Sequence, residues 1–108
     1  MPAASQPQTD IVTLKGEIDL HRSAEVRETL KPLIARKTKR ILLNFSGVTY
    51  IDSSGLAVLI ETLQRVQSYG GKFAIFGLQE SVKAIFSIAR LDQIFRIFSD
   101  EAEAVAGM

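Results

Sequence analysis

Two short polar segments hold the side chains best suited to chemistry, Gly16-Glu17-Ile18-Asp19 and Asp52-Ser53-Ser54-Gly55. In the second segment, two hydroxyl groups follow a carboxylate at the start of an amphipathic stretch. A helix N-terminus offers unpaired N–H groups and a partial positive charge. Asp52 or Ser53 is therefore a good helix cap, and an exposed Ser53 would also receive a phosphate well. Gly55 lacks a side chain, which lets a second protein approach closely.

A catalytic interpretation of the same residues is weaker. Ser53 or Ser54, His21 and Asp52 supply a nucleophile, a base and an orienting carboxylate in principle. The sequence has neither the Gly-x-Ser-x-Gly turn of α/β-hydrolases nor a phosphate-binding Gly-x-x-x-x-Gly-Lys-Ser/Thr loop. With no cysteine, one histidine and scattered carboxylates, it offers no convincing set of metal ligands. We therefore predict a binding protein without a cofactor rather than an enzyme.

Strands and helices are expected to alternate along the chain. From Asp10 onward, Val12, Leu14 and Ile18 point one way and polar residues the other, as in a strand with one wetted face. Further apolar patterns predict strands at 40–45, 72–76 and 94–98, and helices at 23–37, 54–67, 80–89 and about 100–105.

Local signals set the expected ends of these elements. Asp19 or Ser23 would cap the first helix, and Ser99 or Asp100 the last. Pro32 would kink the first helix or end it early, because proline removes a backbone hydrogen bond. We expect a turn at Ser46-Gly47.

The alternation predicts one compact α/β domain with a mixed, mostly parallel sheet of about four to five strands and about four helices. Residues 1–9 would form a flexible lead-in, and residues 10–108 the domain. In such sheets functional groups gather at the carboxyl ends of the strands, where both polar segments lie.

The helix predicted after the second polar segment carries a clear apolar stripe. Its members are Leu56, Leu59, Ile60, Leu63 and Val66. Val58 is expected to lie away from this stripe, on the face of Glu61 and Arg65. Two interpretations of Val58 remain open, a contact with a partner protein or a scattered exposed apolar residue.

The composition excludes several partners. Thirteen basic and twelve acidic residues leave a formal charge of +1, which argues against nucleic acid. The one basic cluster, Arg36-Lys37-Lys39-Arg40, follows a predicted helix, where the helix dipole favours cations. No apolar run approaches the roughly 20 residues that span a bilayer, and the first ten residues show no secretory signal. We expect a cytoplasmic protein with no membrane partner.

The second polar segment and its neighbours resemble the phosphorylation motif of anti-sigma factor antagonists of the STAS domain family. The residues that carry this resemblance are Tyr50-Ile51-Asp52-Ser53-Ser54-Gly55-Leu56. Three flanking segments strengthen the resemblance and extend it over nearly the whole chain: 16–19 (GEID), 43–48 (LNFSGV) and 89–95 (ARLDQIF). The family usually has a further strand before the first of these segments, and MPAASQPQ does not have a strand pattern.

The resemblance implies a single STAS-like domain and a partner-switching mechanism. The unphosphorylated domain would bind an anti-sigma factor that is also an ATP-dependent serine kinase, and so free its target. Phosphorylation of Ser53 would abolish binding, and a separate serine phosphatase would restore it. We expect the free domain to be a monomer. The predicted partner-binding residues are Asp19, Asp52, Ser54, Gly55 and Val58. The alternative function is an unphosphorylated STAS scaffold or an accessory domain of a transporter.

Overall fold

The computed structural model describes residues 9–108 of the chain. In chain order the elements are β1 (Thr9–Ile18), α1 (Leu20–Ala35), β2 (Arg40–Ile51), α2 (Ser53–Ser68), β3 (Lys72–Phe76), α3 (Glu80–Ile88), the 3-10 turn η2 (Leu91–Gln93), β4 (Arg96–Phe98) and α4 (Glu101–Gly107). The four strands in this range form one sheet in the order β1-β2-β3-β4, with every pairing parallel. The predicted α/β class is confirmed, and the described sheet is wholly parallel rather than mixed.

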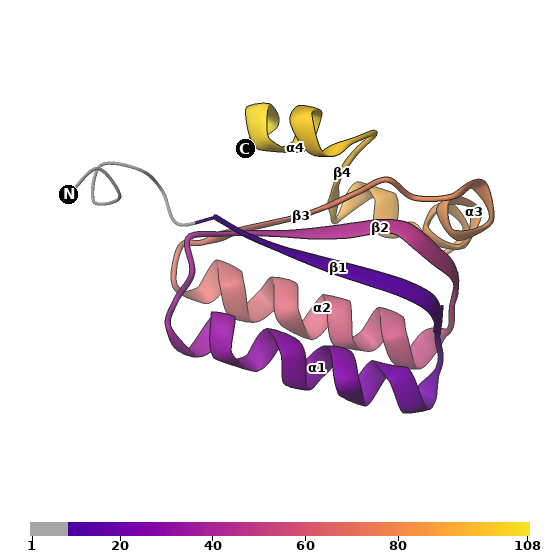
Figure 1. Cartoon of the computed structure of the whole chain (residues 1–108), viewed down its shortest axis with the longest axis horizontal. Coiled ribbons are helices and arrows are strands. Elements are labelled where there is room, and N and C mark those ends of the chain that lie inside the picture. The colour runs from indigo at the N-terminus through magenta and orange to yellow at the C-terminus, as the bar shows by residue number, and fades with distance from the viewer. Residues whose placement is uncertain (1–8) are drawn as a thin grey trace.

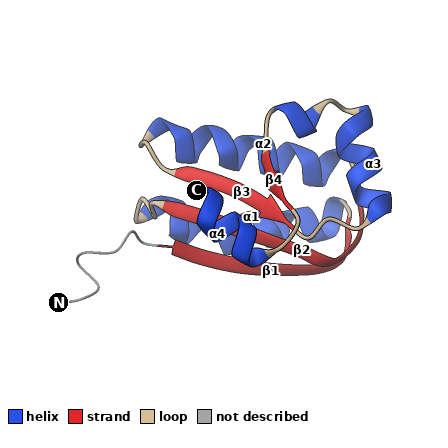
Figure 2. Ribbon diagram, turned by 90° about the horizontal axis from the view of Figure 1, so that it is seen from above, coloured by secondary structure: helices blue, strands red, loops and turns tan. Residues whose placement is uncertain are grey.

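The sheet is covered unequally on its two faces. Helices α1 and α2 lie side by side against one face, while of the described elements only the short α4 lies against the other (Figures 1 and 2). The main core fills the first side, with Phe45, Phe86 and Ile75 completely buried. A second, smaller cluster under α4 contains Leu42 and Ala104. The open part of the sheet agrees with the polar residues of β1, such as Lys15.

Two bulges lengthen β2 relative to its neighbour β1. Between the pairs Thr13–Asn44 and Lys15–Gly47, β2 has one residue more than β1, and a second irregularity follows at Thr49. The predicted turn at Ser46-Gly47 is therefore wrong, because the chain continues as a bulged strand. Bulges bend a strand and increase its twist. Here they leave backbone carbonyls that the start of α3 binds: Gln79 Nε2 donates to Ser46 O at 2.9 Å.

Other predicted boundaries need smaller corrections. Helix α1 begins three residues before the expected Ser23 and continues through Pro32 to Ala35, since Arg36 N still donates to Pro32 O at 3.1 Å. The last strand starts at Arg96 rather than at residue 94, because η2 occupies the preceding residues. Strand β1 begins at Thr9, within the expected lead-in, and the rest of that lead-in lies outside the described residues.

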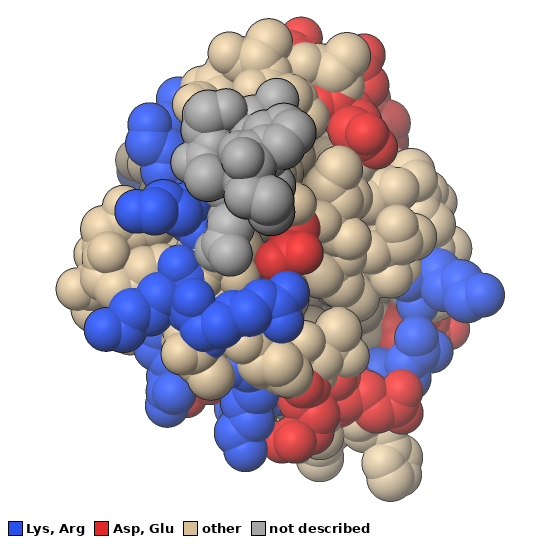
Figure 3. All heavy atoms as spheres, turned by 60° about the vertical axis from the view of Figure 1, so that its left-hand side comes forward, with Lys and Arg blue, Asp and Glu red and all other residues tan. Residues whose placement is uncertain are grey.

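Basic residues gather at the end of the molecule opposite Ser53, around the loops before β2 and β3 (Figure 3). Two members of the predicted basic cluster are engaged within the fold. Arg36 Nη2 donates to Asp10 Oδ2 at 3.1 Å, and Arg40 Nη2 donates to Val105 O at 2.7 Å, which holds the end of α4. Nearby, burial raises the pKa of the Tyr69 phenol, whose O–H donates to Thr38 O at 2.7 Å.

Candidate functional site

The carboxyl ends of β1 and β2 bring the two polar segments together. Ile18 pairs with Ile51 at the end of the parallel ladder, and the N–H of Asp52 donates to Ile18 O at 3.2 Å. Each strand is followed at once by an aspartate and a helix, so α1 and α2 start next to each other. The sequence-based placement of both segments at one sheet edge is confirmed.

Asp19 caps α1. Its backbone is extended, and its Oδ1 accepts from Arg22 N at 3.0 Å. The Arg22 side chain turns back to the strand, where its Nη2 donates to Lys15 O at 3.0 Å. Gly16 has a φ of 77°, a left-handed conformation that glycine adopts without strain. The side chain of Asp19 itself remains exposed.

Asp52 caps α2 in the same extended conformation. Its Oδ1 accepts two hydrogen bonds, from Ser54 N at 2.9 Å and from Gly55 N at 3.2 Å. Ser53 is the first residue of the helix, and its side chain is exposed. The structure thus assigns the cap to Asp52 and leaves Ser53 facing solvent, with no hydrogen bond from its hydroxyl group to any described residue.

Gly55 is buried beneath the helix start rather than displayed on its surface. A Cβ atom at this position would lie 2.6 Å from Ile51 Cγ1 and 2.9 Å from Ile18 Cγ2. These distances are too short for a real side chain. The absence of a side chain therefore lets the first turn of α2 rest directly on the ends of β1 and β2, which is a different reason for glycine from the one predicted.

The predicted exposure of Val58 is wrong. Its side chain is only 1% exposed and belongs to the main core, together with Leu59 and Leu63. The buried face of α2 also includes Thr62, whose hydroxyl group donates to Val58 O at 2.8 Å. The helix is rotated so that Leu56 and Ile60, predicted as stripe members, lie only partly buried at its side.

The alternative catalytic arrangement is not assembled. His21 lies exposed on the first turn of α1, and none of the hydrogen bonds of the described residues joins it to Ser53 or Ser54. Asp52 directs its carboxylate at the α2 backbone instead of at an imidazole. Within residues 9–108, no three carboxylate or histidine side chains gather closely enough to hold a metal ion.

Two exposed apolar residues at this edge were missed by the sequence interpretation. Leu20, the first residue of α1, is 74% exposed, and Tyr50, next to last in β2, is 46% exposed. Leu20 follows the capping aspartate as Ser53 follows Asp52, a correspondence visible in the sequence. The exposure of Tyr50 follows from the bulge at Thr49, which no short-range sequence signal reveals.

Comparison with known proteins places the chain in a family. The STAS domain model matches residues 1–104. An anti-sigma F factor antagonist of Paenibacillus polymyxa is 30% identical over 96 residues, which cover 88% of this chain and 82% of that protein. The crystal structure of a Thermotoga maritima protein assigned as an anti-sigma factor antagonist superposes with a TM-score of 0.86 at 26% identity, covering 92% of this chain and 86% of the other.

A third protein shares the fold at lower identity. The Bacillus cell fate determinant SpoIIAA, solved in its phosphorylated form, gives a TM-score of 0.72 at 20% identity, covering 94% of this chain and 91% of the other. Among the described residues, no helix is long and apolar enough to cross a membrane. From the family match and the shared fold, the chain belongs to the STAS domain family.

Proposed function

We propose that this chain is an anti-sigma factor antagonist whose partner binding is switched off by phosphorylation of Ser53. The unphosphorylated form binds an anti-sigma factor that is also an ATP-dependent serine kinase, and a serine phosphatase reverses the modification. The names of the relatives support the general role. The observation that carries the switch is the exposed Ser53 hydroxyl group at the first position of α2, directly after a capped helix start.

The Asp52 cap determines where a phosphate on Ser53 would go. Asp52 Oδ1 already accepts the N–H groups of Ser54 and Gly55, so the phosphate can use those donors only by displacing it. The modification adds about −1.5 to −2 charges beside Asp52 and Asp19, which follow neighbouring strand ends. The phosphate therefore stays on the outside of the cap, where its charge opposes burial in an interface.

The proposed docking surface follows the shared edge of β1 and β2. It contains Asp19, Asp52 and Ser54, and it gains apolar contact area from the exposed Leu20 and Tyr50. Gly55 is not part of the surface itself, but it lets the first turn of α2 pack directly against the ends of β1 and β2. Val58 is excluded from this surface because it is buried.

The test is to measure the affinity of Ser53 variants for the purified anti-sigma kinase by isothermal titration. Ser53→Ala should bind within about threefold of wild type, because it removes a hydroxyl group that makes no bond in the described fold. Ser53→Asp should bind about a hundredfold more weakly, since an interface then buries an unmatched carboxylate. Ser68→Asp, an exposed serine at the far end of α2, is the matched control and should bind like wild type.

Mass spectrometry after incubation with the kinase and Mg-ATP should place one phosphate on Ser53 and none on Ser54. A phosphate on Ser54 would contradict the assignment of the acceptor. Equal affinities of Ser53→Ala and Ser53→Asp would contradict the switch itself. That result would favour the alternative role, a constitutive scaffold or a transporter-accessory domain.

A further inference from the structure

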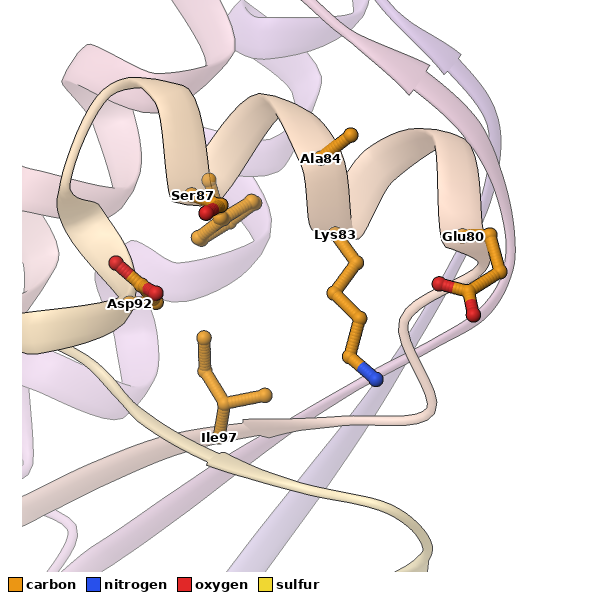
Figure 4. A pocket seen from close by; sticks show the side chains of 7 residues that line it. Glu80, Lys83, Ala84, Ser87, Asp92 and Ile97 are labelled. Carbon is orange, nitrogen blue, oxygen red and sulfur yellow. The ribbon is translucent and has the colours of Figure 1, made fainter.

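An open cavity of about 490 Å³ lies between α3 and β4, and none of the residues of the site around Ser53 lines it (Figure 4). The helix on one side of it is tied to the irregular part of β2. The start of α3 is bound to the bulged carbonyls, by Gln79 to Ser46 and by Ser81 Oγ to Thr49 O at 3.3 Å. The helix is thereby held against β2, and the side chain of Ile97 on β4 remains only partly covered.

The cavity has an apolar floor with charged groups around it. Ala84 and Ile97 supply accessible apolar surface, whereas Phe86, which also lines the cavity, is itself completely buried. Figure 4 shows Lys83 and Asp92 on opposite sides, with Ile97 between them. A volume of this size falls within the range of about 300–1,000 Å³ that is usual for sites of small molecules.

The charges around the cavity are not neutralised by the protein. All ion pairs among residues 9–108 lie elsewhere, and within the same range neither the Lys83 ammonium group nor the Asp92 carboxylate has a hydrogen-bond partner. Glu80 stands one helical turn before Lys83, a spacing at which ion pairs form, and yet its carboxylate does not pair with that lysine. Two opposite charges thus lie at the same cavity without a partner among the described residues.

We propose that this cavity binds a short zwitterionic peptide, with its carboxylate at Lys83, its ammonium group at Asp92 and an apolar side chain against Ile97. The spacing favours a dipeptide or tripeptide over a single amino acid. Lys83 and Ser87 are one helical turn apart, about 5–6 Å, and Asp92 lies beyond Ser87 (Figure 4). The ends of an extended dipeptide are separated by about 7 Å, whereas those of one amino acid are adjacent.

The probe is the dipeptide Leu-Phe, titrated into the isotopically labelled full chain and followed by backbone amide NMR shifts. Two derivatives each remove one charge: N-acetyl-Leu-Phe lacks the ammonium group, and Leu-Phe amide lacks the carboxylate. The free dipeptide should shift the amides of Ala84, Ser87 and Ile97. Each derivative should bind about two- to fivefold more weakly, the range expected of an exposed ion pair.

Variants assign each charge to its partner. In Lys83→Met, the free dipeptide and its amide should bind equally, while in Asp92→Asn the free and acetylated dipeptides should bind equally. Glu80→Gln should strengthen binding about twofold, because it removes a carboxylate that repels the ligand's own. Lys72→Met, an exposed lysine at the start of β3 outside the cavity, should leave the order of affinities unchanged.

Several results would overturn the proposal. One is the absence of shifts at millimolar dipeptide, and another is a set of shifts away from α3 and β4. A third is that Lys83→Met or Asp92→Asn still binds the free dipeptide more tightly than the derivative that lacks the matching charge. That result would show that these two side chains do not bind the charged groups of the dipeptide. The substituted side chains are exposed, so equal melting temperatures should confirm that each variant is folded.

Discussion

The starts of α1 and α2 make an informative comparison because their local chemistry is nearly the same. Each follows the end of one of two paired strands, and each is capped by an aspartate in extended conformation, Asp19 or Asp52. The residue after the aspartate is exposed in both cases, Leu20 in one and Ser53 in the other. Capping alone therefore does not distinguish the proposed phosphorylation site from an ordinary helix start.

The two starts differ in how deeply they are set into the fold. The first buried residue of α2 is Gly55, the third after its cap, whereas the first buried residue of α1 is Ser23, the fourth after its cap. Helix α2 thus contacts the strand ends from its first turn. An exposed hydroxyl group whose helix turn is packed against the core is a well-defined target for a second protein. Of the two helix starts, only that of α2, with Ser53, has this combination.

Val58→Asp should have the largest effect of the changes considered at either helix start. An unpaired carboxylate would replace a side chain that is 1% exposed, which should lower the free energy of unfolding by about 3–5 kcal/mol. Urea denaturation measures this loss. Ala57→Asp, on the exposed face one residue earlier, should change stability by no more than about 0.5 kcal/mol. Equal stabilities of the two variants would show that α2 does not direct Val58 into the core and Ala57 toward solvent.

Gly55→Ala should be the next most damaging change. The added methyl group would press on Ile51 and Ile18, an overpacking that costs about 1–3 kcal/mol of unfolding free energy. Arg22→Ala, at the corresponding position of α1, should cost only about 0.5–1 kcal/mol, because it removes one exposed hydrogen bond, to Lys15 O, and a weak surface ion pair. Thermal and urea unfolding of both variants provide the measurement. A neutral Gly55→Ala would remove the main difference between the two starts.

The rotation of α2 could not be predicted from its apolar residues. Leu56 and Ile60 are more hydrophobic than Gly55 and Thr62. The face of α2 that carries the largest apolar side chains therefore differs from the face that is buried in the structure. Glycine is buried here because the strand ends leave no room for a side chain. Threonine is buried because its hydroxyl group is satisfied by the backbone of its own helix. Both reasons depend on contacts that are absent from the local sequence.

The rest of the fold was predictable where periodicity and caps act locally. The alternation in β1, the aspartate before each helix and the parallel class follow from neighbouring residues. The bulges of β2 depend on its pairing with β1 and on the α3 residues that bind the bulged carbonyls. The cavity beside Ile97 is lined by residues of α3, η2 and β4, which no local sequence pattern brings together.

Removal of each capping aspartate compares the two starts directly. Asp52→Ala should lower the free energy of unfolding by about 1–2 kcal/mol, and Asp19→Ala by about 0.5–1 kcal/mol, because Asp52 satisfies two N–H groups and Asp19 one. Asp52→Asn and Asp19→Asn, which keep an accepting oxygen, should be close to wild type in urea denaturation. A larger loss at Asp19 would mean that the number of capped donors does not set the stability of these helix starts.

Leu20→Ser should have the smallest effect on the stability of the fold. The variant tests whether an aspartate followed by a serine at a helix start is enough for recognition by the kinase. The side chain is 74% exposed, so its replacement should change the free energy of unfolding by less than about 0.5 kcal/mol. The variant presents a hydroxyl group after Asp19 as Ser53 does after Asp52, but the buried residues beneath it are Ser23 and Val26 instead of Gly55 and Val58. In the background of Ser53→Ala, incubation with the cognate kinase and Mg-ATP should leave Leu20→Ser unlabelled by mass spectrometry. Labelling at residue 20 would show that the capped helix start suffices, and that the tighter seating of α2 serves stability rather than recognition.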